Sequence, residues 1–305
     1  MKTYTMLPLA AMAILATAAC NTESGSQETN DSNDSETFTY ESEKGPIEVP
    51  TNPERIVALS SAPNLLSLDV PLVGVDEWTY GHPLFTEELE EAETQVVSDE
   101  NLESIVELQP DLIIVGAHAN NIDRLEEVAP TIVYTWGELD YLTQHVELGK
   151  LVDKEEEAQA WVDDYSDRAA QLGDDIRSEI GEETTVSVFE VENEDFYTFN
   201  DGFARGTELL YQAMDLEMPE EVAEDVAESG YYQMSTEVIG DYAGDFIVLS
   251  RRAQADTSFM ESDTWNNIPA VQNDRVIEID MESSTYSDPR TLDHLMEVFE
   301  DGFLK

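Results

Sequence analysis

The stretch NLESIVELQPDLIIV (residues 101–115) has a counterpart later in the chain, STEVIGDYAGDFIVL (residues 235–249). Both begin with a residue typical of a helix N-cap, Asn101 or Ser235, whose side chain can accept from a free N–H group of the first turn. Both carry a glutamate at the third position and an aspartate at the eleventh, which opens an apolar, mostly β-branched run. Such runs are typical of strands buried on both faces. The repeat therefore predicts two similar lobes.

Strands and helices alternate around each copy. We place the N-terminal lobe over residues 45–137, with strands at 55–60, 71–75, 95–97, 112–115 and 131–134. We place the C-terminal lobe over residues 183–305, with strands at 185–191, 245–249 and 275–279, and with an aromatic-rich loop at 192–206. The alternation implies right-handed crossovers. We expect an α/β fold of two lobes, each a mainly parallel sheet flanked by helices.

Residues 138–182 join the lobes and are predicted to be helical, with one break near residues 151–154. From Ala158 onward the apolar residues are spaced three or four apart, which is one stripe of an amphipathic helix: Trp161, Tyr165, Ala169, Leu172 and Ile176. A helix of about 22 residues spans some 33 Å, enough to run along two lobes. A coiled-coil partner helix is the alternative, but the stripe is short and poor in Leu and Ile.

The N-terminus is typical of a bacterial lipoprotein. Residues 1–19 contain Lys2, an apolar stretch too short to span a bilayer, and small residues before Cys20, the only cysteine. The segment LATAAC resembles a lipobox, except that Thr17 stands where leucine is usual, so we expect Cys20 to be lipidated. The alternative is an incidental cysteine near a cleavage site. Residues 20–44 are almost entirely polar and are expected to form a disordered tether.

The composition is strongly acidic. The chain has 68 acidic and 14 basic residues, a net charge of −54, which argues against nucleic acid as a partner because phosphate binding needs clustered Lys and Arg. The acidic residues are spread along the chain, and they would repel one another strongly in dilute buffer. At molar salt the Debye length falls to about 3 Å, so we expect a protein exposed to salt outside a salt-adapted bacterium. A metal-buffering surface is the alternative.

Four segments together resemble one protein family: PERIVALSSAPNLLSLDVPLVGV (53–75), NLESIVELQPDLIIV (101–115), RLEEVAPTIVY (124–134) and WNNIPAVQNDRVIEID (265–280). The family comprises the helical-spine (class III) solute-binding proteins of ABC importers for iron–siderophore complexes and cobalamin. The resemblance runs from Asn52 to Phe299. It implies a monomeric, lipid-anchored protein on the outer face of a Gram-positive cell membrane, with one rigid interlobe helix and a ligand cleft. It also implies that Glu103 and Glu237 dock on arginines of the ABC permease dimer. First-turn glutamates stabilised by the helix dipole are the simpler reading of the same residues.

Loops at the carboxyl ends of parallel strands carry the ligand contacts in such folds. We expect contacts from aromatic, basic and imidazole side chains there, with Ser60, Ser61 and Asn120 nearby: Trp78, Tyr80, His118, Trp136, Tyr197, Arg205, Arg251 and Arg252. Aromatic rings give a chelate apolar contact area, and arginines can bind its oxygens bidentately. About three arginines suit a ferric hydroxamate or citrate–hydroxamate siderophore better than a highly anionic triscatecholate. No resident cofactor is expected.

The sequence is also compatible with other ligands. Haem could take His118 or a tyrosine as axial ligand, and cobalamin fits the same family. Direct zinc or manganese binding needs a His and carboxylate cage, whereas the four histidines are scattered and no metal is expected. Catalysis is disfavoured because Gly-x-Ser-x-Gly, HExxH and phosphate-binding glycine motifs are absent. A surface adhesin is disfavoured by the two similar lobes and the aromatic cleft.

Overall fold

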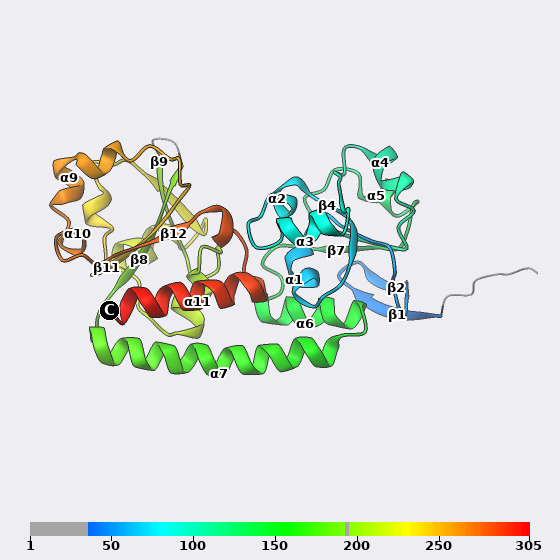
Figure 1. Cartoon of the computed structure of the whole chain (residues 1–305), viewed down its shortest axis with the longest axis horizontal. Helices are drawn as coiled ribbons and strands as arrows, with labels where there is room; N and C mark the ends of the chain where they lie inside the picture. Colours follow the sequence, from blue (N-terminus) through cyan, green and yellow to red (C-terminus); the bar gives the residue numbers. More distant parts are fainter. Residues whose placement is uncertain (1–35, 193–194) are drawn as a thin grey trace, which may run out of the picture. The chain divides into compact units, whose positions relative to one another are not determined.

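The computed structural model describes residues 36–192 and 195–305. It contains two five-stranded sheets and a two-stranded hairpin, with helices around the sheets (Figure 1), which confirms the predicted α/β fold of two lobes. Cys20 and the predicted export signal lie outside the described residues. Within them, no helix has the length and apolar character needed to cross a membrane.

The N-terminal lobe is built on a fully parallel sheet in the order β5-β4-β3-β6-β7. Its strands are β3 (Ile56–Ala58), β4 (Leu72–Val75), β5 (Gln95–Val96), β6 (Leu112–Gly116) and β7 (Thr131–Tyr134). Its helices are α1 (Ala62–Ser67), α2 (Glu77–Tyr80), α3 (Thr86–Glu91), α4 (Leu102–Glu107) and α5 (Ile122–Leu125). Successive residues of β6 enter different hydrophobic clusters, Ile114 one and Ile113 with Val115 the other. The apolar run is therefore buried on both faces, as expected.

The expected tether ends earlier than residue 44. Strand β1 (Thr37–Ser42) pairs in antiparallel fashion with β2 (Gly45–Pro50). The hairpin is held because Tyr40 is buried against the lobe and its hydroxyl lies 3.1 Å from that of Tyr134 and 3.0 Å from a carboxylate oxygen of Glu147. Phe38 packs against the same core. The polar composition of this segment predicted disorder, but its few apolar residues, Phe38 and Tyr40, are enough to dock the strand on the lobe.

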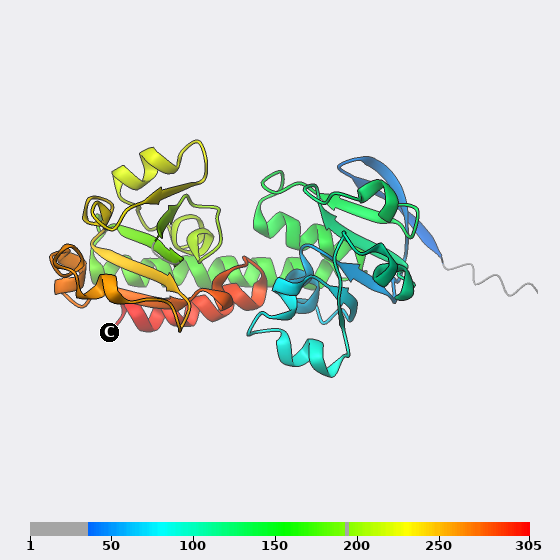
Figure 2. The same ribbon diagram turned by 90° about the horizontal axis from the view of Figure 1, so that it is seen from above.

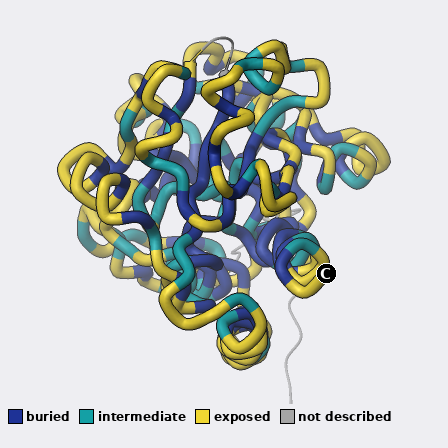
Figure 3. The backbone as a smooth tube through the Cα atoms, turned by 90° about the vertical axis from the view of Figure 1, so that its left-hand side faces the viewer, coloured by how far each residue is buried: buried dark blue, intermediate teal, exposed yellow. Residues whose placement is uncertain are grey.

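The C-terminal lobe has a mixed sheet in the order β10-β9-β8-β11-β12 (Figure 2). Strands β8 (Val186–Glu192), β11 (Phe246–Arg251) and β12 (Val276–Asp280) are parallel, whereas β9 (Asp195–Phe199) and β10 (Tyr231–Met234) pair in antiparallel fashion. The surrounding helices are the π-helix η1 (Glu208–Ala213), α8 (Glu220–Val226), η2 (Ile239–Asp241), η3 (Ser258–Glu261), α9 (Asp263–Asn266), α10 (Pro269–Gln272), η4 (Glu282–Ser284) and α11 (Pro289–Phe303). Figure 3 views the molecule from the end where this lobe lies, with buried segments inside and exposed segments at the surface.

Strand β9 corrects the expectation of a long aromatic loop at residues 192–206. Phe196 and Phe199 are buried and enter different hydrophobic clusters, as residues of opposite parity on a strand must. Phe196 and Phe199 were expected in a loop, but they complete the core on either face of the sheet.

The two copies of the repeat are alike in the contacts of their aspartates, Asp111 and Asp245, more than in their helices. Asp111 accepts hydrogen bonds from the backbone N–H groups of Glu54 (2.8 Å) and Arg55 (2.9 Å), just before β3. Asp245 accepts one from the N–H group of Thr185 (3.1 Å), just before β8. Each aspartate thus links the start of its own strand, β6 or β11, to the start of the adjacent parallel strand, β3 or β8.

The helical halves of the repeat differ between the lobes. The first copy forms α4, although the Asn101 side chain makes no capping bond. In the second copy Ser235 begins a turn, which is followed only by the short 3₁₀ helix η2. The expected side-chain caps are therefore not made by either residue.

Two helices, α6 (Tyr141–Leu151) and α7 (Glu155–Ile180), follow β7 and are separated at the predicted break. Ala158 near the start of α7 belongs to the hydrophobic core of the N-terminal lobe. Tyr165, Ala169 and Ile176 further along the same helix belong to the core of the C-terminal lobe. One straight element, drawn in green along the lower edge of Figure 1, therefore completes two cores.

Helix α11 supplies a second connection between the lobes. Its N-cap, Asp288, is buried and accepts hydrogen bonds from its own helix at Arg290 N and from Ser67 Oγ of α1 (3.0 Å). Arg290 donates to the backbone oxygen of Leu66 and pairs with Glu88 on α3. The N-terminal end of α11 is thus fastened to the N-terminal lobe while the rest of the helix packs in the C-terminal core.

Gly173→Ala is expected to destabilise the protein by about 1–3 kcal/mol despite the better helix propensity of alanine. A Cβ atom at this position of α7 would overlap the backbone of Met214. Gly240→Ala is the matched control, because its Cβ would meet nothing closer than 3.9 Å. Chemical denaturation of both variants measures the difference, and equal stabilities would show that α7 has room to move at Gly173.

His145 on α6 is buried against Trp161 of α7, and burial lowers the pKa of its imidazole from 6.5 to about 4. As pH falls, His145 is protonated in the unfolded chain before it is protonated in the folded protein. The contribution of the neutral, buried imidazole to the free energy of unfolding is therefore complete above about pH 6.5 and is lost as pH falls towards 4. The free energy of unfolding of His145→Gln should consequently fall less between pH 7 and pH 5 than that of the wild type. A parallel fall in both proteins would show that His145 is protonated equally in the folded and unfolded states.

Candidate functional site

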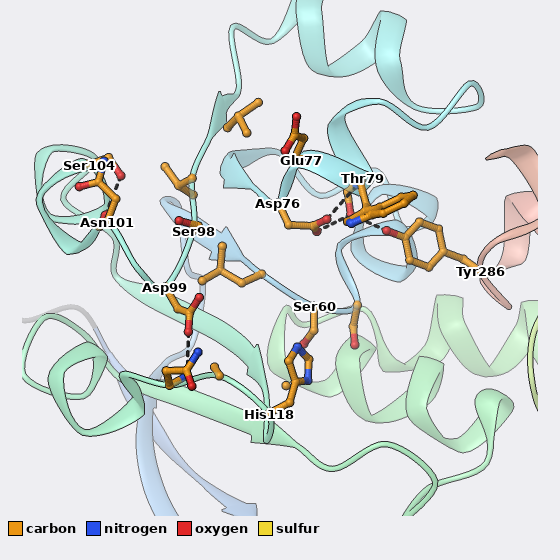
Figure 4. A pocket seen from close by; sticks show the side chains of 18 of the residues that line it. Ser60, Asp76, Glu77, Thr79, Ser98, Asp99, Asn101, Ser104, His118 and Tyr286 are labelled. Carbon is orange, nitrogen blue, oxygen red and sulfur yellow. Dashed lines mark hydrogen bonds between the residues drawn. The ribbon is translucent and has the colours of Figure 1, made fainter. Parts of the chain in front are cut away.

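A cavity of about 720 Å³ lies at the carboxyl ends of the N-terminal lobe's strands. Its walls come from the loops after β3, β4, β5 and β6, with a contribution from the segment after η4 of the C-terminal lobe. Figure 4 shows these side chains converging from several loops. The principal lining residues are Ser60, Ser61, Asp76, Glu77, Trp78, Thr79, Asp99, His118, Asn120, Thr285 and Tyr286. The position agrees with the rule that ligands bind beyond the carboxyl ends of parallel strands.

The short helix α2 presents Trp78 to this cavity. Asp76 caps the helix by accepting from Thr79 N (3.0 Å) and Thr79 Oγ1 (2.6 Å). The indole of Trp78, in the first turn, stays 66% exposed. The hydroxyl of Thr79 also lies 3.3 Å from that of Tyr286, which reaches over from the C-terminal lobe. Trp78 and Tyr286 both line the cavity, so its aromatic wall draws on both lobes; Figure 4 shows Tyr286 beside Thr79.

His118 forms the opposite side, and Gly116 makes room for it. A Cβ atom on Gly116 would overlap the His118 ring, so the absence of a side chain at the end of β6 lets the imidazole fold back there. Asp99 accepts a hydrogen bond from the backbone N–H of Asn120 (2.7 Å), which fixes the same loop. Ser60 Oγ is buried and has no hydrogen-bond partner in the part of the chain that the structure describes. This side is therefore polar, with an imidazole, a carboxylate and a hydroxyl.

Three predicted aromatic contacts lie elsewhere. Tyr80 is half-buried against the N-terminal core and does not line the cavity. Trp136, in the loop after β7, is 74% exposed and meets the edge of Phe203 of the C-terminal lobe at a ring distance of 5.2 Å. Tyr197 of β9 is also half-buried, with its ring 6.4 Å from that of Tyr231. Of the predicted aromatic and imidazole contacts, Trp78 and His118 are those that the structure brings together.

Arg205 is committed to a buried carboxylate. Its Nε and Nη2 atoms donate to the two oxygens of Glu190, at 2.8 and 3.0 Å, in a bidentate pair. Glu190 is almost completely buried near the end of β8 and also accepts from Ser250 Oγ (3.2 Å). The guanidinium lies over the Phe199 ring at 4.8 Å. Removing Arg205 would leave a buried charge unpaired, so its first role is structural.

The other two predicted arginines are paired as well. Arg251 donates from Nε to Glu278 on the neighbouring strand β12 (2.9 Å), and Arg252 donates to Glu282 of η4 (3.3 Å). None of the three predicted arginines lines the cavity. Sequence reasoning did not single out Asp76, Asp99 and Tyr286, which line the cavity. It also missed Glu190, which binds Arg205. Only Asp76 had a usable pattern, an aspartate three residues before Thr79 at a helix start.

A smaller cavity of about 340 Å³ adjoins the first and shares Trp78 and Tyr286 with it. It is also lined by His82, whose pKa is lowered to about 4 by burial. Within residues 36–192 and 195–305, no group of three or more His, Cys, Asp or Glu side chains is arranged to hold a metal ion. Glu103 and Glu237 are both exposed, the first in the first turn of α4 and the second in the turn before η2.

The chain is similar to known proteins along most of its length. A family model described as periplasmic binding protein matches residues 56–282. The iron(3+)-hydroxamate-binding protein FhuD of Bacillus subtilis (strain 168) is 29% identical over 97% of this chain and 96% of its own length. The solved FhuD protein of S. pseudintermedius has a TM-score of 0.80 and 31% identity, covering 88% of this chain and 98% of that one.

A further solved structure, that of FhuD2 from Staphylococcus aureus with bound ferrioxamine B, has a TM-score of 0.78 and 30% identity. It covers 83% of this chain and 98% of its own. Sequence and fold therefore agree over both lobes and the helix between them. The family match, which spans the N-terminal sheet, the long helix and the C-terminal strands, makes this chain a member of the periplasmic binding protein family.

Proposed function

We propose that the chain is the substrate-binding lipoprotein of an ABC importer, which captures a ferric hydroxamate siderophore in its cleft and delivers it to a membrane permease. The observation that carries this proposal is the aromatic-walled cavity of about 720 Å³ at the carboxyl ends of the N-terminal strands. Its volume is typical of sites for small organic ligands. The Bacillus subtilis relative is named for iron(3+)-hydroxamate binding, which supports this ligand class for the chain.

The proposed place of action is the outer face of the cell membrane, with Cys20 as the lipidated residue. A net charge of −54 supports a salty environment, because screening at high ionic strength relieves the mutual repulsion of the carboxylates. Haem is the second candidate ligand, and one observation favours it: His118 lines the cavity and offers an imidazole of the kind that ligates haem iron.

Trp78→Leu is expected to weaken ferric hydroxamate binding about tenfold, equivalent to about 1.4 kcal/mol. The exposed indole gives the chelate contact area that leucine cannot replace. The purified, metal-free protein should be titrated in high salt with ferrioxamine B, haemin, cobalamin and zinc, following tryptophan fluorescence and, for affinity, calorimetry. Tyr242→Leu, an aromatic substitution outside the cavity lining, is the control. Submicromolar binding of zinc with no response to any chelate would overturn the proposal.

The double variant Glu103→Ala/Glu237→Ala is expected to abolish siderophore uptake by cells while leaving ligand affinity unchanged. Both side chains are exposed and neither lines the cavity, so their proposed role is contact with the permease. Glu107→Ala/Glu224→Ala removes the same number of charges from exposed positions on α4 and α8 and should transport normally. Loss of ligand affinity in the first double variant would instead show that the glutamates support the cleft.

A further inference from the structure

The charge of the cavity wall is negative. Asp76, Glu77 and Asp99 all line it, and no lysine or arginine is found among the lining residues that the structure describes. His118 is the single imidazole among them. The adjoining smaller cavity adds Glu282, whose charge is balanced by Arg252. A ligand in the main cavity therefore meets up to three carboxylates and no guanidinium or ammonium group from these walls.

The three arginines expected as ligand contacts lie outside the cavity lining, and each is paired with a glutamate. Arg205 holds both oxygens of Glu190, a residue only 4% exposed. A ligand carboxylate that drew Arg205 away would leave this buried charge without its partner, at a cost that normally exceeds the gain. Arg251 and Arg252 are likewise paired, with Glu278 and Glu282.

Two of the wall carboxylates are fixed in position. Asp76 is held by its two hydrogen bonds from Thr79, and Asp99 by its bond from the backbone of Asn120. Each carboxylate oxygen can accept more than one hydrogen bond, so both side chains keep capacity for a ligand donor. They stand on loops after different strands, and both line the cavity together with Trp78 and His118.

We infer that this site selects ferric chelates of zero or positive net charge, with Asp76 and Asp99 receiving a cationic or N–H-bearing arm of the ligand. The inference rests on the proposed function and narrows it. Citrate–hydroxamate chelates, which retain carboxylates, are excluded as preferred ligands, and so are triscatecholates. The wall carboxylates attract a cationic chelate and repel an anionic one, so they discriminate between chelates by charge.

A charge series on one iron centre tests this inference. Ferrioxamine B carries a pendant ammonium group, which acetylation makes neutral and succinylation makes anionic, while the hydroxamates around iron stay the same. At 1 M salt the field of the distant surface is screened within about 3 Å, so the remaining preference is local. We expect the dissociation constant, measured by calorimetry, to rise about three- to tenfold with each unit of charge lost.

Asp76→Asn/Asp99→Asn should bring the three dissociation constants to within about twofold of one another. An asparagine oxygen can still accept the backbone N–H bond of Thr79 or of Asn120, and the amide NH2 that replaces the second oxygen of Asp76 can donate to the Thr79 hydroxyl instead, so the loops stay folded. Glu90→Gln/Glu107→Gln changes the net charge equally at exposed positions outside the cavity and should keep the wild-type preference. Equal affinities in the wild type, or tightest binding of the anionic derivative, would overturn the inference alone. Failure of all three chelates to bind would overturn the proposed function and the inference with it.

Discussion

Helix α7 belongs to two hydrophobic cores at once, and this constraint governs the rest of the molecule. Ala158 is buried in the N-terminal core and Tyr165 to Ile176 in the C-terminal one. A helix bends sharply only where its hydrogen-bond ladder is interrupted, and α7 is continuous over Glu155–Ile180. The buried carboxylate of Asp288 adds a second connection through Ser67. Large separation of the lobes would break both connections, so the cavity is expected to be largely formed before the ligand arrives.

The shortage of basic residues shapes the candidate site indirectly. Several of the nine arginines stabilise the C-terminal ends of short helices, where backbone carbonyl groups lack partners. Arg55 donates to Leu108 O after α4, Arg177 to Met214 O after η1, and Arg290 to Leu66 O in α1. Arg205 neutralises a buried glutamate instead. None of these four arginines lines the cavity, whose described walls carry aromatic rings, hydroxyl groups, an imidazole and carboxylates.

Sequence reasoning succeeded where one local pattern decides the structure. The apolar runs after Asp111 and Asp245 became buried strands, and the stripe from Ala158 to Ile176 became the long helix. It failed for β1, whose docking depends on Tyr40 meeting Tyr134 far along the chain. It also failed for the role of Arg205, because a chain with 68 acidic residues gives no indication of which carboxylate will be the partner. Glu190 was hidden within a strand that reads as uniformly buried.

The two copies of the repeat place different demands on their residues. The aspartates perform the same task in both lobes, since each fixes the start of a parallel strand beside its own. The glutamates do not share a local structure, because Glu103 stands on a helix and Glu237 on a turn. Dipole stabilisation by a helix can therefore account for Glu103 but not for Glu237. What both glutamates share is exposure and a fixed distance in sequence from a strand anchored by aspartate. If a permease contacts both glutamates, as proposed, it recognises their positions relative to the two sheets, because charge alone does not distinguish them from the surrounding acidic residues.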